Sequence, residues 1–128
     1  MQFIIATHGR FASGIFNTLE LLMGKKRKIL TLDAYVDDER SVQVRLEEML
    51  KGVEEPIIAF TDIAGGSVNR ETMMVLKNKD AYIITDFNLA LLMEISLLSD
   101  DEISEERINK CINLCQTQMR CLRMVRKE

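Results

Sequence analysis

Four short apolar runs alternate with stretches of helical spacing, and this alternation restricts the fold more than any other feature. The runs are rich in β-branched residues or bounded by turns, as buried parallel strands are; they cover residues 3–7, 29–34, 56–61 and 81–85. Apolar residues recur at helical spacing over 12–23, 42–50 and 68–76. The sequence therefore predicts an α/β fold: a single doubly wound, mainly parallel sheet with helices on both faces, an α/β/α sandwich.

The ends of the helices also carry signals. Gly24 and Gly52 are predicted to end the first and second helices, and the acidic segment 37–39 is expected to open the second. After the fourth strand, further helices are predicted over 89–98 and 103–126, the latter with Ser104 as N-cap. No linker rich in Pro, Gly or Ser interrupts the pattern, so we expect a single domain over residues 1–128.

Charge and cysteine usage narrow the functional classes. The net charge of −3 and pI near 5.3 provide no basic face for nucleic acid. The start of the chain has no basic leader or cleavage signal, and no apolar run approaches the ~18 residues of a membrane span. The spacing of Cys111, Cys115 and Cys121 matches no zinc pattern, so we expect reduced, buried or half-buried thiols and no metal. We expect a cytoplasmic protein.

The only histidine, His8, stands where the first apolar run meets polar, glycine-bearing chain. In an α/β protein that point is the carboxyl end of a strand, the edge along which ligands and reactive groups collect. Imidazole exchanges protons and electrophiles readily near neutral pH. The position therefore favours a reactive imidazole over a packing one.

The segment after the third strand contains Asp62, Gly65, Gly66 and Ser67. Two glycine amides together with a helix N-terminus form an anion-binding nest, although a glycine pair before an N-cap is also an ordinary turn. If the first and third strands are neighbours, this loop faces His8. Asp62 would then accept a hydrogen bond from one ring nitrogen and leave the other as a nucleophile; an aspartate that only caps a turn is the alternative.

Several other catalytic classes lack their sequence signals. No cysteine lies near a predicted strand end, and there is no nucleophile elbow, which argues against serine hydrolase and cysteine protease chemistry. A Walker loop and a dinucleotide fingerprint are also absent. The residues therefore favour a nucleophilic His8 beside a glycine loop that would accommodate a phosphoryl group.

Three motifs in order resemble the enzyme IIA component of the mannose family of the bacterial phosphoenolpyruvate:sugar phosphotransferase system. They are Ala6-Thr7-His8-Gly9 with Phe11-Ala12-Ser13-Gly14, then Thr61-Asp62 followed by Gly65-Gly66-Ser67-Val68-Asn69, and finally Asn88-Leu89 with Leu91-Leu92-Met93-Glu94. The resemblance covers about residues 1 to 120 of one mannose-type IIA domain. Residues 116–128 match less well and are expected to form a helical tail.

The resemblance implies a phosphocarrier without a metal or other cofactor. His8 would accept a phosphoryl group from the histidine-containing phosphocarrier protein and pass it to a IIB component; the membrane is reached only through the IIC and IID components. Asp62 would orient the imidazole, and Gly65, Gly66 and Ser67 would bind the phosphoryl group. The resemblance further implies a homodimer, with an edge strand that is antiparallel or exchanged between subunits.

The chain departs from the family pattern at positions that carry no reacting group. Val68 and Ala90 stand where proline is common, and Ala64 stands where a large apolar residue is common. Arg10 and Arg70 flank the two loops, either as solvated charges or as helpers in transfer. Two alternatives stay open: the phosphotransfer subunit of a dihydroxyacetone kinase, and a non-catalytic α/β regulatory or binding module.

Overall fold

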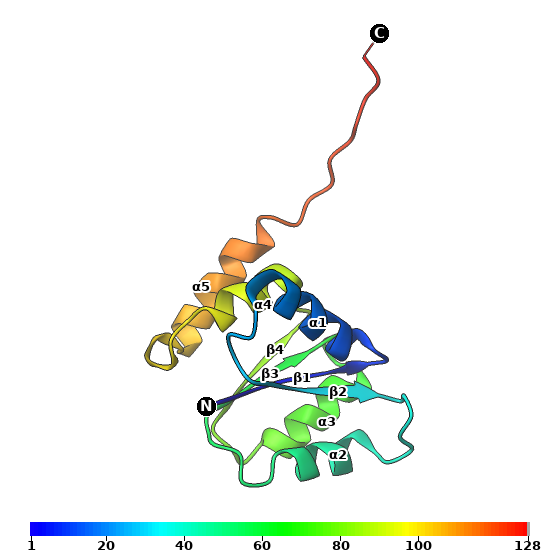
Figure 1. Cartoon of the computed structure of the whole chain (residues 1–128), viewed down its shortest axis with the longest axis vertical. Coiled ribbons are helices and arrows are strands. Elements are labelled where there is room, and N and C mark those ends of the chain that lie inside the picture. Colours follow the sequence, from blue (N-terminus) through cyan, green and yellow to red (C-terminus); the bar gives the residue numbers. More distant parts are fainter. Residues whose placement is uncertain (128) are drawn as a thin grey trace.

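The central sheet of the computed structural model is parallel and has the strand order β2-β1-β3-β4 (Figure 1). The structure describes residues 1–127. Its strands are β1 (Gln2–His8), β2 (Ile29–Ala34), β3 (Ile57–Thr61) and β4 (Ala81–Thr85). All four predicted strands are present, and their ends differ from the prediction by at most one residue.

Helices cover both faces of this sheet (Figure 1). α1 (Phe11–Met23), α4 (Leu89–Ser96) and α5 (Glu105–Gln116) lie on one face, and α2 (Val42–Met49) and α3 (Ser67–Leu76) on the other. The predicted doubly wound α/β fold is therefore confirmed.

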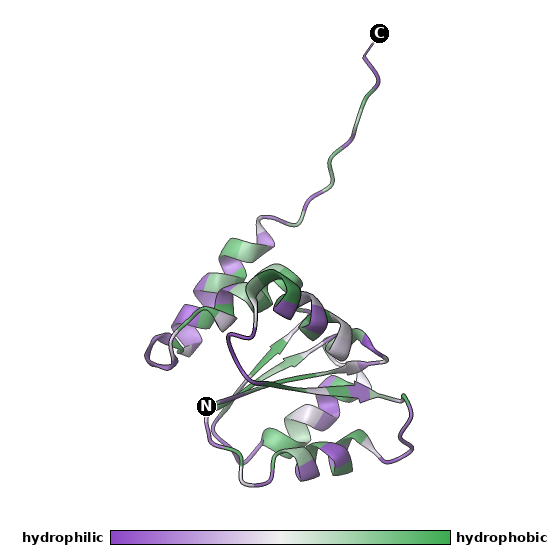
Figure 2. Cartoon of the chain, viewed as in Figure 1, coloured by the Kyte–Doolittle hydropathy of each residue, from purple (hydrophilic) through white to green (hydrophobic). Residues whose placement is uncertain are grey.

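The strands are mostly hydrophobic along their length (Figure 2), because helices cover both faces of the sheet. Along β1, Phe3 and Ile5 pack with α1 and α4, whereas Ile4 and Ala6 pack with α2 and α3, and none of these four side chains is exposed. Full burial of a side chain such as Phe3 or Ile5 contributes roughly 1.5–3 kcal/mol. The continuous apolar run of β1 thus contributes side chains to two separate hydrophobic cores, one on each face of the sheet.

The strand order decides where a site can form. The chain passes from β1 to β2 on one side and later to β3 on the other, so the topological switch point lies at the carboxyl end of β1. His8 pairs in register with Ala34, the last residue of β2, and Ala6 pairs with Thr61, the last residue of β3. The segments after these three strands therefore emerge side by side.

The start of α2 differs from the prediction. Its N-cap is Ser41, whose hydroxyl accepts the N–H of Val44 at 3.1 Å, and not the acidic segment 37–39. A cap must lie next to the first turn to reach its amides, which residues 37–39 do not. Asp38 instead forms ion pairs with Arg40 and Arg45. The predicted N-cap of the last helix, Ser104, is confirmed by its 3.1 Å bond from the N–H of Arg107.

The helix predicted over 103–126 is only half correct. α5 ends at Gln116, and residues 119–127 are exposed, without helical structure, and run away from the domain (Figure 1). The predicted helical tail over 116–128 is wrong for these residues, and Glu128 lies outside the described part. A short segment that buries no apolar face gains too little to offset the cost of helix nucleation. Cys111 and Cys115 are buried as expected, but Cys121 on this tail is exposed.

Candidate functional site

The turn after β1 is tied to its surroundings on two sides and presents His8. The buried hydroxyl of Thr7 accepts the N–H of Ala12 at 2.8 Å, which joins β1 to the first turn of α1. The N–H of Gly9 donates to the carbonyl of Ala34 at 2.9 Å, with Gly9 at φ +59°, a conformation that favours glycine. The His8 side chain is 42% exposed at this edge.

Asp62 holds the imidazole through Nδ1. Oδ2 of Asp62 lies 2.8 Å from Nδ1 of His8 and also accepts the backbone N–H of His8 at 2.8 Å. Its other oxygen, Oδ1, accepts the N–H of Ile63 at 3.0 Å. Partial burial raises the pKa of this carboxyl, but the hydrogen bonds from His8 and Ile63 outweigh burial and hold the pKa below its ordinary value.

The bond to Asp62 selects one form of the ring. An ionised carboxylate only accepts hydrogen bonds, so Nδ1 of His8 carries the proton and Nε2 of the neutral ring carries a lone pair. The hydroxyl of Ser67 lies 3.2 Å from Nε2. A ring nitrogen with a lone pair therefore faces the start of α3, and the loop after β3 lies beside His8, as expected for neighbouring first and third strands.

Gly66 permits the close approach of the loop to the ring. A Cβ at this position would lie 3.2 Å from the carbonyl oxygen of Ile63 and 3.6 Å from Cε1 of His8. Contacts near 3.2 Å are tighter than van der Waals packing allows without a shift of the neighbour. A side chain at 66 would therefore press on the carbonyl of Ile63 and force the loop to shift, and its outer atoms would lie against the ring of His8.

The free hydrogen-bond donors near Nε2 come from the first turn of α3. The N–H of Gly65 donates to Oδ1 of Asn69 at 3.1 Å, and the N–H of Gly66 donates to the carbonyl of Ile63 at 3.0 Å. Within the described chain, the N–H groups of residues 67–69 have no acceptor, as is usual for a helix N-terminus. The glycines shape the loop, and their own amides are already bonded.

Asn69 braces this loop from inside, a role that sequence reasoning did not assign. Its side chain is 6% exposed, and its Nδ2 donates to the hydroxyl of Thr61 at 2.9 Å while Oδ1 accepts from Gly65. One amide thus links the end of β3, the loop and α3. The available signal was a polar residue next to Val68 and Thr72, positions that recur at helical spacing on the buried face of the helix.

Tyr35 is a second residue that the sequence analysis missed. Its hydroxyl lies 2.7 Å from Oγ of Ser67, and its ring centroid lies 5.5 Å from that of His8. Its backbone has φ +67°, which costs a bulky residue on the order of 1–3 kcal/mol. The signal was its place directly after the predicted end of the second strand, at the same sheet edge as His8.

The two arginines that flank the loops are bonded elsewhere. Arg10 pairs with Asp37 at 3.2 Å, and both side chains are largely exposed, so the pair contributes little to stability. Arg70 donates through Nη1 to the carbonyl of Gly65 and so supports the loop. In residues 1–127 neither guanidinium is bonded to His8 or Ser67.

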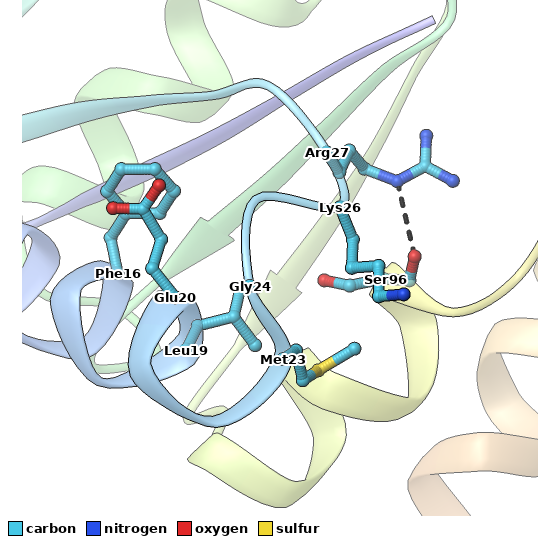
Figure 3. A pocket seen from close by; sticks show the side chains of 8 residues that line it. All are labelled: Phe16, Leu19, Glu20, Met23, Gly24, Lys26, Arg27 and Ser96. Atoms are coloured by element: carbon cyan, nitrogen blue, oxygen red, sulfur yellow. Dashed lines mark hydrogen bonds between the residues drawn. The ribbon is translucent and has the colours of Figure 1, made fainter.

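The sequence holds no second histidine that could carry this chemistry elsewhere. A pocket at the far end of α1, next to Gly24 and Ser96, has a volume of about 10 Å³, room for roughly one water molecule (Figure 3). Arg27 closes it with a bond from Nε to the carbonyl of Ser96 at 3.5 Å. Among residues 1–127 no three His, Cys, Asp or Glu side chains are placed to hold a metal ion, and no helix is long and apolar enough to cross a bilayer.

Comparisons with known proteins agree on one family. The family model EIIA-man, described as PTS system fructose IIA component, matches residues 2–112. No curated protein matches the chain.

Three solved structures share the fold over nearly the whole chain. A protein from Klebsiella pneumoniae subsp. pneumoniae, provisionally described as a phosphoenolpyruvate-dependent sugar phosphotransferase system permease, is 29% identical with a TM-score of 0.84, covering 94% of this chain and 89% of that one. The PTS IIA protein associated with the fucose utilization operon of Streptococcus pneumoniae is 26% identical (TM-score 0.73; 94% and 91% covered). The mannose/sorbose specific IIA subunit from Enterococcus faecalis is 19% identical (TM-score 0.79; 99% and 98% covered) and supports the fold alone.

Proposed function

Because this chain belongs to the EIIA-man family of phosphotransferase system IIA components, we propose that it is a cytoplasmic phosphocarrier in which Nε2 of His8 accepts and then donates a phosphoryl group. The proposal rests on two contacts of the His8 imidazole, one at each ring nitrogen. Asp62 occupies Nδ1, and the hydroxyl of Ser67 and the start of α3 face Nε2. This arrangement leaves one defined nucleophile.

The transfer needs no redox partner and no metal ion. The lone pair on Nε2 of His8 attacks the phosphorus of the donor's phosphohistidine, so one N–P bond forms while the donor's N–P bond breaks and its electron pair returns to the donor imidazole. The Nδ1 proton stays between His8 and Asp62, and the carboxylate balances the positive charge that develops on the ring. Donation to the next component is the same step in reverse.

In the proposed phosphorylated form, the phosphoryl oxygens face the start of α3. The unbonded N–H groups of residues 67–69 and the hydroxyl of Ser67 offer convergent donors, and the helix dipole favours the negative group. Phosphoryl transfer depends mainly on alignment and on stabilising the charge of these oxygens. Gly65 and Gly66 then act by shaping the loop and by admitting the phosphoryl group next to Cε1 of His8.

Two protein partners follow from the proposed role. The histidine-containing phosphocarrier protein supplies the phosphoryl group, and a IIB component of the same permease receives it. The IIC and IID components connect this chain to the membrane only indirectly. The sugar itself need not touch this chain, because the phosphoryl group leaves on a protein.

The chain also has the features of a subunit that exchanges its end with a second copy. β4 is an edge strand, and the surface beside it is lined by Tyr82, Ile84, Ile108 and Ile112. An exposed edge strand readily pairs with added chain. The tail carries the exposed apolar residues Met119, Leu122, Met124 and Val125. We propose a homodimer in which this tail lies along β4 of the partner.

Radioactive phosphoenolpyruvate with the two general phosphotransferase proteins tests the proposal. The chain is expected to take up acid-labile, alkali-stable label at His8 and to pass it to a IIB component. Label that passes only to a dihydroxyacetone kinase subunit would assign the chain to that system. A chain that takes up no label, while a known IIA control does, would leave only a non-catalytic module.

A further inference from the structure

Three side chains form a hydrogen-bonded row that ends at the reactive nitrogen. The hydroxyl of Tyr35 lies 2.7 Å from Oγ of Ser67, and Oγ of Ser67 lies 3.2 Å from Nε2 of His8. The row joins the ends of three neighbouring elements, because Tyr35 follows β2, His8 ends β1 and Ser67 begins α3. Tyr35 was not among the site residues predicted from the sequence, and the transfer step described above assigns no role to its phenol.

The donors and acceptors in this row have one consistent direction. Nε2 of the neutral ring has a lone pair, because the proton is on Nδ1 against Asp62. The single hydroxyl proton of Ser67 is therefore donated to Nε2, which leaves Oγ of Ser67 as an acceptor toward Tyr35. The phenol of Tyr35 then donates to Ser67, and within residues 1–127 it is the only side chain besides His8 that is hydrogen-bonded to this hydroxyl.

The backbone of Tyr35 adopts an unfavourable conformation, which shows that other interactions keep the side chain in this position. Its φ of +67° is unfavourable for a bulky side chain, and 61% of the residue is exposed, so burial does not explain the conformation. Within residues 1–127 the phenol is hydrogen-bonded to Ser67, and the ring packs on that of His8, with centroids 5.5 Å apart. Both contacts belong to the site.

We propose that Tyr35 is a positioning residue for phosphoryl transfer: its phenol fixes the hydroxyl of Ser67 toward Nε2 of His8. When a phosphoryl group occupies Nε2, the Ser67 proton turns to one of its oxygens, and Tyr35 keeps the same hydroxyl from rotating away. Tyr35 thus acts through Ser67 and not on the reacting atoms. The role in transfer rests on the proposed function, whereas the orientation of Ser67 does not.

A double-mutant cycle on the rate of phosphorylation tests the coupling. Tyr35→Phe removes only the hydroxyl, and we expect it to slow labelling by about 3- to 10-fold, the equivalent of one neutral hydrogen bond. In a Ser67→Ala background the same change is expected to have almost no effect, because its target is gone. Thr18→Val, which removes an exposed hydroxyl whose hydrogen bond goes to the carbonyl of Gly14 within α1, is the control and should label at the wild-type rate.

A measurement on the unphosphorylated protein separates this proposal from the proposed function. The chain has one histidine, so its ring nitrogens give a single set of ¹⁵N resonances. With the ring neutral, Tyr35→Phe and Ser67→Ala are expected to move the Nε2 resonance in the same direction, whereas Thr18→Val leaves it in place. The double variant should match Ser67→Ala alone.

The outcomes are distinct. Wild-type labelling in Tyr35→Phe, an equal loss in both backgrounds, or an unmoved Nε2 resonance would overturn the role of Tyr35. A wild-type chain that takes up no label overturns the proposed function and with it the role in transfer, and the ¹⁵N cycle then still decides whether Tyr35 orients Ser67.

Discussion

Nδ1 of His8 lies 2.8 Å from Oδ2 of Asp62, although 54 residues separate the two in the chain. The contact exists because β1 and β3 are neighbours in the sheet and both end at the same edge. It makes Nδ1 a donor and turns Nε2 toward solvent and the start of α3. The chemistry that we propose depends on this one relationship.

Replacing His8 tests the nucleophile directly. His8→Ala is expected to fold normally, because the side chain is 42% exposed, and to accept no phosphoryl group, because no other imidazole exists in the chain. Circular dichroism checks folding, and the ³²P transfer assay checks activity. Acid-labile, alkali-stable label on His8→Ala would end the assignment.

Replacing Asp62 tests the orienting carboxylate. Asp62→Asn can still hold the ring but cannot balance its developing positive charge, so we expect phosphorylation to slow by ~10²-fold or more. Glu39→Gln, at an exposed position outside the site, is the control and should transfer at the wild-type rate. Equal rates for wild type and Asp62→Asn would leave Asp62 as a turn residue.

The same carboxyl predicts a pH dependence of stability. The folded-state pKa of Asp62 lies below the unfolded value of 3.8, so its contribution is present above the unfolded pKa and is lost as pH falls through the folded one. The free energy of unfolding of wild type, relative to Asp62→Asn, should therefore decline as the pH falls from about 5 through 3.8 and below. Urea titrations of both proteins across this range measure the difference, and a constant difference contradicts the prediction.

A larger side chain at position 66 should obstruct the site, although no reacting group is removed. Gly66→Val places carbon against Ile63 and the ring of His8, and a displacement of about 1 Å there is expected to slow transfer by ~10²-fold. Because Gly66 has φ −69°, the change adds no strain from a left-handed conformation. Gly14→Ala, on an open face of α1, is the control and should stabilise the helix by about 0.5–1 kcal/mol. Unimpaired transfer in Gly66→Val would place the phosphoryl group elsewhere.

Replacing Asn69, which links β3, the loop and α3, should lower both the stability of the fold and the rate of phosphorylation. Asn69→Ala leaves the N–H of Gly65 and the hydroxyl of Thr61 without their partners, with an expected loss of about 1–3 kcal/mol in urea unfolding. The loosened loop should also slow phosphorylation. Asn113→Ala, at an exposed position of α5, is the matched control and should leave both quantities near wild type. Wild-type stability of Asn69→Ala would contradict the bracing role.

Deleting residues 118–128 tests the proposed exchange of the tail. The described part of this segment is exposed, so the deletion should leave the fold intact and convert a dimer into a monomer in light scattering. The experiment is best done in Cys121→Ser, because an exposed thiol can form an unrelated disulfide dimer. A full-length monomer, or a truncated dimer, would exclude the exchange.

Local sequence patterns predicted most of the fold because they report burial directly. Residues 3–7 are apolar without alternation since β1 is covered on both faces, and Ser104 caps α5 because its hydroxyl reaches the first-turn amides within its own segment. The helix predicted over 103–126 extended too far, because a local pattern cannot tell whether residues 119–127 have a surface to pack on.

The sequence by itself determined the class of fold, the strand positions and the candidate residues His8, Asp62 and Ser67, since each of these depends on neighbours close in the chain. Only the tertiary structure decided that β1 lies between β2 and β3, and this order sets every contact of the site. It brought Asp62 to Nδ1 of His8, bonded the amides of Gly65 and Gly66 within the loop, and carried Tyr35 to Ser67. The physical reason is that strand order follows from packing two separate cores on the two faces of one sheet, a property of the whole chain.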